Sequence, residues 1–242
     1  GPEIQSTEEF IEALESKYSE ITDFSARLKI SGTDQALRVE VLAISEPRVL
    51  RVEYLSPPEM KGQFLVVEEN FLYDYRPAQN MVIEKDLEKS NVPVKSANLT
   101  PEYLLELVRS DELRVNLISG PSGLYFPWEQ EEVLEFDLAG PELSDDNSSD
   151  PVYGRDFTTP VPFDFSTDNY VLEIIPKVDG YQFARQVIRF GSDDLLPRRL
   201  VTYFEDEKKE PIRTFVEGVE INPGLDREEI TSLPEDAEVI SG

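Results

Sequence analysis

The chain has 242 residues, of which 39% are hydrophobic, and its 50 acidic and 23 basic side chains give a formal net charge of −27 at pH 7. Such a chain lacks the excess of lysine and arginine that polyanion binding requires, which argues against nucleic acid or an anionic membrane as a direct partner. The absence of cysteine and histidine excludes disulfides, thiol catalysis, Cys/His zinc sites and histidine-based triads. The carboxylates indicate either a soluble, salt-adapted surface or an acidic docking face.

The N-terminal Gly1-Pro2 pair is typical of the remnant of a cleaved expression tag. We therefore expect residues 1–5 to be a flexible tag remnant, and a signal peptide or lipid anchor upstream to have been removed. No apolar run approaches the roughly 18 residues that a membrane helix needs.

A capping box, Ser6-Thr7-Glu8-Glu9, predicts a helix that begins near residue 7. Apolar residues recur at helical spacing up to Ile21, and from Phe24 to Ile30 the period changes to two, as in a strand. The alternating pattern is typical of a strand with one face in water.

Further strands are expected on both sides of a second helix. Five alternating or aromatic runs follow the first strand without an intervening helix, which predicts an antiparallel meander. Thr100-Pro101 marks the start of a short apolar helix. The runs expected as strands are 37–41, 50–54, 64–67, 71–75, 81–83, 113–118, 133–138, 170–175, 186–190, 199–204 and 212–221. Residues 140–167, rich in Pro, Asp and Ser, are expected to form a long surface loop insertion.

The sequence contains only weak matches to motifs for metal binding, glycosylation or catalysis. Asp145, Asn147 and Ser149 have the alternate spacing of a calcium loop, but Asp150 occupies the position where such loops need glycine. Asn98 and Asn147 are formal glycosylation acceptors. No catalytic residue, metal site or cofactor motif is identified, so we expect the protein not to be an enzyme.

The amount of predicted sheet is large for two modest helices. Alternating Phe, Tyr, Leu and Val are ordinary core residues in a β domain. About eleven strands in one curved sheet, however, would leave part of an apolar face uncovered, and a cavity there suits an acyl chain or another elongated apolar ligand.

The order of these motifs resembles the LolA/LolB family of lipoprotein carriers. An amphipathic helix runs directly into a strand (Phe10 to Ile30), residues 47–57 read PRVLRVEYLSP, and residues 69–77 read ENFLYDYRP. The C-terminal part also fits, with Pro197-Arg198-Arg199-Leu200, Val219-Glu220-Ile221-Asn222 and the final residues 233–240.

The resemblance implies a mainly β (α+β) fold, with residues 1–242 forming a single domain. Its sheet would be a single curved, incompletely closed antiparallel β-barrel of about 11 strands with a helical lid. The implied function is that of a periplasmic or other extracytoplasmic carrier that binds lipoprotein acyl chains or a similar lipid and passes them to an acceptor. The implied partners are an acylated lipoprotein or lipid, a donor transporter and an acceptor protein, with the carrier a monomer. One departure is Glu46, which stands where well-known carriers have an arginine that helps control the closed lid.

Eleven residues are expected to line the hydrophobic cavity, three of them on the lid, although a register slip of one would reverse the face of any strand. They are Phe24, Leu28, Leu50, Val52, Tyr54, Phe71, Tyr73, Tyr75, and on the lid Leu104, Leu105 and Val108. Two alternatives remain open: an envelope lipid-sensing regulator of the MucB/RseB type, and a structural envelope lipoprotein that binds a protein partner.

Overall fold

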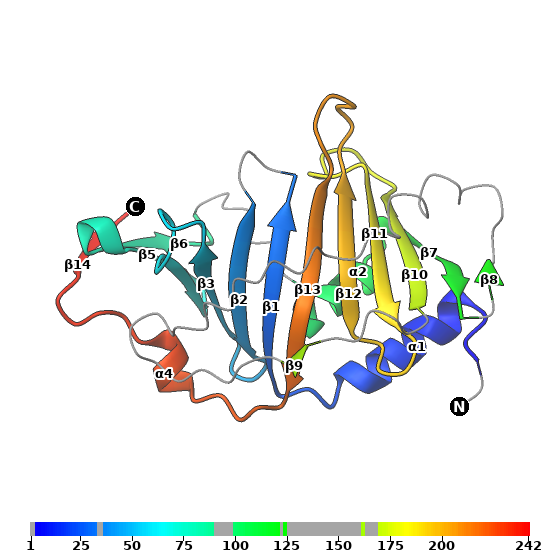
Figure 1. Cartoon of the computed structure of the whole chain (residues 1–242), viewed down its shortest axis with the longest axis horizontal. Coiled ribbons are helices and arrows are strands. Elements are labelled where there is room, and N and C mark those ends of the chain that lie inside the picture. Colours follow the sequence, from blue (N-terminus) through cyan, green and yellow to red (C-terminus); the bar gives the residue numbers. More distant parts are fainter. Residues whose placement is uncertain (1–2, 33–35, 90–98, 122, 125–160, 163–168) are drawn as a thin grey trace.

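A computed structural model describes residues 3–32, 36–89, 99–121, 123–124, 161–162 and 169–242. In these residues fourteen strands form one sheet, with the two main helices on the same face (Figure 1). The helices are α1 (Thr7–Tyr18), α2 (Pro101–Arg109), α4 (Arg227–Thr231) and the 3-10 turn η1 (Pro77–Gln79). The strands are β1 (Asp23–Ser31), β2 (Leu37–Ile44), β3 (Val49–Ser56), β4 (Phe64–Glu68), β5 (Phe71–Arg76), β6 (Met81–Asp86), β7 (Leu113–Gly120), β8 (Gly123–Leu124), β9 (Val161–Pro162), β10 (Asn169–Pro176), β11 (Arg185–Gly191), β12 (Pro197–Tyr203), β13 (Ile212–Ile221) and β14 (Glu238–Ser241).

The strand order is β14-β6-β5-β4-β3-β2-β1-β13-β12-β11-β10-β7-β8, with β9 paired to β13. The first six strands form the expected meander, and β13 returns to pair with β1. Among the described strands only β14 and β6 pair in parallel. Since the edge strands β14 and β8 do not pair with each other, the sheet is open. The open, mainly antiparallel sheet expected from the sequence is therefore confirmed, with the short strands β8, β9 and β14 in addition to eleven longer ones.

Both main helices begin where the sequence predicts. The Ser6 Oγ accepts a hydrogen bond from the amide of Glu9 at 3.1 Å. The Glu9 carboxylate accepts one from the amide of Gln5 at 2.9 Å, one residue earlier than a strict capping box requires. The Thr100 hydroxyl caps α2 in the same way, accepting from the amide of Tyr103 at 3.4 Å.

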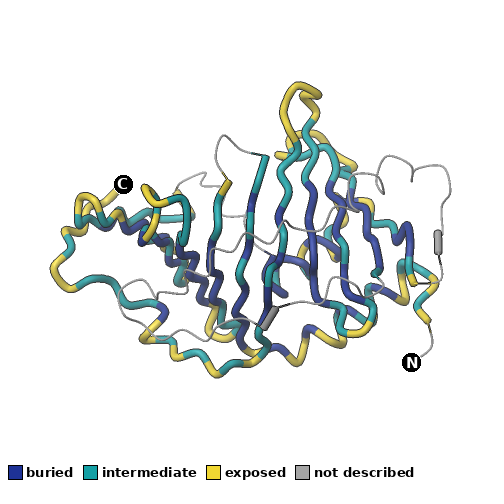
Figure 2. Tube along the Cα trace, in the orientation of Figure 1, coloured by how far each residue is buried: buried dark blue, intermediate teal, exposed yellow. Residues whose placement is uncertain are grey.

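The main core lies on the face that carries α1 and α2, here called the inner face. Alternate residues of β1 (Phe24, Ala26, Leu28 and Ile30) join this core, as the period of two predicts. Figure 2 shows the buried backbone concentrated in the middle of the central strands and the exposed backbone at the turns and the hairpin tips.

The opposite, outer face is also covered in part, by the C-terminal segment. After β13 the chain runs through α4 to β14 at the sheet edge (Figure 1). Ile230 packs against Leu42 and Val49, and Leu233 packs in a separate cluster on β4 to β6. The C-terminal segment thus takes the place of solvent over part of the outer face of β2 to β6.

Several predicted features lie outside the described residues. These are the strand expected at 133–138, the calcium-like residues 145–150, the glycosylation acceptors Asn98 and Asn147, and most of the loop expected at 140–167. Two residues of that loop are described: Val161 and Pro162 form β9, opposite Val219 and Gly218 of β13.

Candidate functional site

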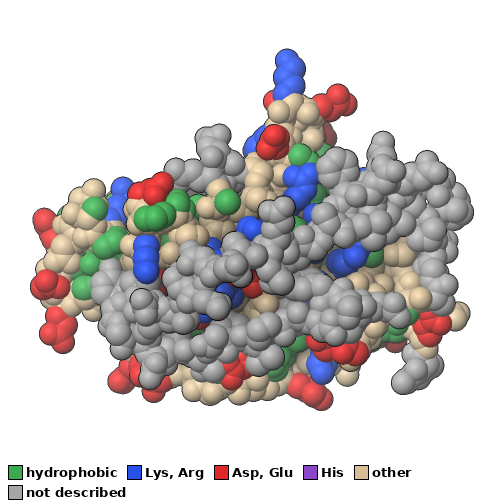
Figure 3. Space-filling view, in the orientation of Figure 1, with side chains coloured by type: hydrophobic (Ala, Val, Ile, Leu, Met, Phe, Trp, Pro, Cys, Tyr) green, Lys and Arg blue, Asp and Glu red, His purple; other side chains and the backbone are tan. Residues whose placement is uncertain are grey.

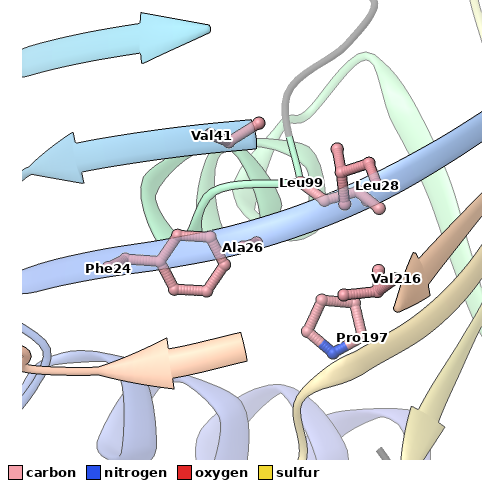
Figure 4. Close-up of a pocket in the computed structure, with 7 residues that line it drawn as sticks. All are labelled: Phe24, Ala26, Leu28, Val41, Leu99, Pro197 and Val216. Carbon is pink, nitrogen blue, oxygen red and sulfur yellow. The ribbon is translucent and has the colours of Figure 1, made fainter. Parts of the chain in front are cut away.

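A narrow apolar gap lies between the inner face and the start of α2. It is too narrow to admit a water molecule. Figure 4 shows side chains from β1, β2 and β13 around it, together with the chain just before α2. The lining residues are Phe24, Ala26, Leu28, Val41, Leu99, Pro197 and Val216. The site as it stands is therefore dry and closed.

A larger open cavity, here called the mouth cavity, lies beside this gap. Its volume is about 890 Å³, within the range of ligand sites. The two spaces share β13: Val216 lines the gap, whereas Thr214 and Ile212, at the next alternate positions on the same face, line the mouth cavity. Helix α2 contributes Tyr103 and Leu107 to the mouth cavity. The gap and the mouth cavity thus lie along the same strand, β13, on the inner face.

Ion pairs hold α2 at both of its ends. Arg48, in the turn before β3, contacts Glu102 at 2.9 Å and Glu106 at 3.4 Å. At the other end, Arg109 contacts Glu15 of α1 at 2.7 Å. Partial burial raises the pKa of Glu102, and the nearby Arg48 opposes that rise. Both arginines are about half exposed, so water can replace these ion pairs and they restrain α2 only weakly.

Eight of the eleven predicted cavity residues lie together on the inner face. Six are buried in the main core and two, Tyr54 and Leu105, are partly buried against it. Only Phe24 and Leu28 line the gap directly. The six core residues are Phe24, Leu28, Leu50, Val52, Leu104 and Val108.

The other three residues, Phe71, Tyr73 and Tyr75, do not join them. Tyr75 pairs with Phe64 across β4 and β5, with ring centroids 5.0 Å apart, and the guanidinium of Arg51 lies 3.7 Å from the Phe64 ring. Arg51 lies between two inward residues of β3, so all of these side chains point to the outer face. Grouping Phe71, Tyr73 and Tyr75 with Leu50 in one cavity is therefore a register error of one residue.

The ion pairs around Arg48 could not be foreseen from the sequence motifs, nor could the two aromatic residues Tyr181 and Phe183 that line the mouth cavity. Glu46 stands where an arginine was expected to contact the lid, whereas Arg48, two residues later, reaches α2. The spacing of Glu102 and Glu106, one helical turn apart, was the available signal. Tyr181 and Phe183 lie between two strands and carried no pattern of their own.

The described residues contain no group of acidic side chains that could hold a metal ion. Burial raises the pKa of Tyr103, so at neutral pH it keeps its proton. The chemistry that this arrangement supports is the reversible accommodation of an apolar molecule. Within the described residues, no helix is long and apolar enough to cross a membrane.

No protein-family model matches the sequence, and no curated protein sequence matches it. Among solved structures, an uncharacterized conserved protein from Thermus thermophilus aligns with a TM-score of 0.56 at 16% identity, over 97% of this chain and 98% of that one. The two chains share a fold. A putative outer membrane lipoprotein-sorting protein domain from Vibrio parahaemolyticus aligns with a TM-score of 0.45 at 10% identity, over 92% and 95% of the two chains. A LolA superfamily protein from Nitrosomonas europaea aligns with a TM-score of 0.37 at 12% identity, over 92% and 97%.

Proposed function

We propose that this protein binds an acyl chain, of a lipoprotein or a similar lipid, between the inner face of the sheet and α2, and passes it to an acceptor. The observation that carries the proposal is the dry apolar gap beneath the start of α2, with the open mouth cavity lined by the next inward residues of β13. An elongated apolar molecule would occupy both spaces once α2 moves, and we propose no chemical reaction. The eight inner-face residues predicted from the sequence would surround the chain.

Ligand entry requires α2 to move, because the gap is too narrow in this closed form. Leu104 is 1% exposed and Leu107 is 6% exposed, so α2 covers the inner face with its own apolar side chains. At about 0.8 kcal/mol per buried methylene, a sixteen-carbon chain gains on the order of 10 kcal/mol from leaving water. Closure of α2 over its own leucines offsets part of that gain, and this leaves the ligand bound weakly enough to transfer.

The exterior fits a carrier that works outside the cytoplasm and does not dock on anionic lipid. Carboxylates outnumber basic groups by 50 to 23, and they lie around the rim of the face shown in Figure 3. Repulsion between this surface and anionic bilayers would leave release to an acceptor protein.

The direct test replaces Ala26, which lines the gap and is 1% exposed, by leucine. Since one added methylene in a closely fitting apolar site changes affinity by about tenfold or more, we expect Ala26→Leu to weaken binding of a fluorescent sixteen-carbon fatty acid by at least that factor. The matched control is Ala237→Leu, because Ala237 packs on the outer face, and it should leave the affinity unchanged.

Circular dichroism would establish that both variants are folded. Equal affinities of the two variants would count against the gap as the binding site. Native mass spectrometry of the purified wild-type protein adds an independent measurement. Bound lipid would support the proposal, whereas a stable protein partner and no lipid would favour a structural role.

A further inference from the structure

The wall of the mouth cavity combines aromatic rings with charged side chains. Tyr181 and Phe183 pack edge to face with their ring centroids 5.5 Å apart. The Tyr181 hydroxyl donates a hydrogen bond of 2.8 Å to the carboxylate of Glu112. Both rings, and that carboxylate, line the cavity. An aromatic pair and an acidic group therefore meet at one side of the opening.

A further aromatic ring in the lining of the cavity already holds a cation on its face. The ammonium of Lys209 lies 3.6 Å from the centroid of the Phe204 ring, and both residues line the cavity. A ring face attracts an ammonium group through the negative potential of its π-system. Because Lys209 is exposed, its side chain can leave the ring for water and free the face for another cation.

The charge around this position disfavours an anion. Residues 204–211, at the tip of the β12–β13 hairpin, contain four carboxylates and two lysines, and both kinds of side chain are visible at that tip in Figure 3. Among the described lining residues, Glu106 and Glu112 outnumber the single cation Lys209. An anionic head group placed there would face net negative charge, whereas a cationic one would be attracted.

We propose that the mouth cavity selects a ligand whose head group is cationic, an amine or a quaternary ammonium, with its apolar chain directed toward the gap. The head group displaces Lys209 from Phe204, and the carboxylate of Glu112, which lines the same cavity, adds electrostatic attraction. This selectivity rests on the proposed function, because it assigns the polar end of the ligand whose chain the inner face binds.

The experiment compares three twelve-carbon amphiphiles that share one chain and differ in head group: dodecyltrimethylammonium, dodecanol and dodecanoate. Each is titrated below its critical micelle concentration into the full chain, at fixed salt and neutral pH. We expect the ammonium to bind about two- to thirtyfold more tightly than the alcohol, the range of a single cation–π contact, and the carboxylate to bind most weakly.

Two variants separate a specific site from the general attraction of an acidic protein for cations. Phe204→Leu keeps an apolar side chain but removes the ring, so it should weaken ammonium binding severalfold and leave dodecanol binding unchanged. Glu112→Gln should also weaken ammonium binding. Its matched control, Glu84→Gln, removes the same charge at β6, on the far side of the sheet order from the mouth, and should have no effect.

Dodecanoate binding as tightly as the ammonium would overturn the selectivity while leaving the carrier function intact. If Phe204→Leu weakened the binding of all three probes equally, the selectivity would also be overturned, since the ring would then contribute only apolar surface. Failure of all three probes to bind the wild-type protein would overturn the carrier function together with the selectivity.

Discussion

Arg51 is a fully buried cation on the outer face, and its partners explain how the C-terminal segment is attached. It contacts the carboxylate of Glu53 at 3.2 Å and lies over the ring of Phe64. It also donates hydrogen bonds to the carbonyl oxygens of Ile230 and Ser232, at 3.3 and 3.4 Å. One side chain thus joins β3 to the residues that lead to β14.

Replacing Arg51 by methionine should destabilise the protein strongly. Glu53 is 2% exposed, so the variant would break a buried ion pair by removing one partner, which costs about 3–5 kcal/mol. Urea unfolding would measure the loss. The double variant Arg51→Met/Glu53→Gln should recover part of it, because both charges of the pair are then removed. A double variant that is as unstable as the sum of the two single variants would show that the two residues are not coupled.

Glu40 should make stability depend on pH. Burial raises its pKa to about 7, Arg27 and Arg51 oppose the rise, and Glu53 adds to it. Because the pKa in the folded state lies above the ordinary value of 4.5, this residue stabilises the fold below about pH 4.5, and that contribution is lost as the pH rises through 7.

The variant Glu40→Gln keeps the shape of the protonated acid and removes the free-energy cost of ionising a buried carboxyl group. We expect little change in the free energy of unfolding at pH 4.5 and a gain of about 2–3 kcal/mol at pH 8. Urea titrations of both proteins at pH 4.5, 6 and 8 would test it. A difference that does not change with pH would exclude the buried carboxyl as the cause.

At the scale of elements, α2 is the helix that the proposed function requires to move. Its ion pairs with Arg48 are exposed, and such pairs contribute about 1 kcal/mol or less. We expect Arg48→Ala to raise hydrogen exchange of the α2 amides by about two- to fivefold. Uptake of a fluorescent fatty acid should become faster to a similar extent.

The matched control is Arg76→Ala, because Arg76 forms an ion pair with Asp74 at 3.1 Å on β5, away from α2. Exchange in α2 should not change in this variant. If Arg48→Ala also left the exchange of α2 unchanged, the contacts of Arg48 would not restrain the helix.

The strand β14 pairs with the edge of β6 that faces away from β5, but few side-chain contacts hold β14 in place. All four of its residues are exposed, and Val239 and Ile240 are 56% and 37% exposed. Deleting residues 238–242 should therefore reduce stability by about 1 kcal/mol or less. It would also uncover the hydrogen-bonding edge of β6, and such edges associate.

Sedimentation at about 0.1 and 1 M NaCl would detect this association, which should be stronger at high salt because charge repulsion is then screened. A control with Val239→Lys and Ile240→Lys keeps the strand but removes its apolar surface, and it should remain monomeric. A truncated protein that is monomeric at both salt concentrations would contradict a protective role for β14.

The eleven longer strands could be predicted from the sequence, but the faces of one hairpin could not. In β1 a polar residue follows each apolar one, so the inward set is evident. In β4 and β5 both faces are at least partly buried: Phe64, Val66 and Tyr75 pack on the outer face, and Leu65 and Val67 pack on the inner one. Because apolar side chains occur at consecutive positions there, alternation carries no information about which set faces the helices.

The same limit applies to the site. The apolar inner face follows from periodicity, whereas the mouth cavity depends on residues from α2, the β10–β11 connection and the β12–β13 hairpin, which are distant in sequence. The contact between Arg48 and α2 joins residues more than fifty positions apart. Charge complementarity could indicate such a pair, but only the fold shows that the two groups meet.

For the whole molecule, the charge of −27 should make stability depend on salt. Like charges repel more in the compact state than in the unfolded chain, and the screening length falls from about 10 Å at 0.1 M salt to about 3 Å at 1 M. We therefore expect the midpoint of thermal unfolding to rise with KCl over this range.

Neutralising Glu205, Glu207 and Glu210, all exposed on the β12–β13 hairpin, would change the charge from −27 to −24 (−27 + 3). The unfolding midpoint of the triple glutamine variant should depend less steeply on KCl than that of the wild type, because fewer repulsive charges remain to be screened. Identical salt dependence in the two proteins, or a midpoint that falls with KCl, would show that the carboxylates do not limit stability and would favour their role as a docking face.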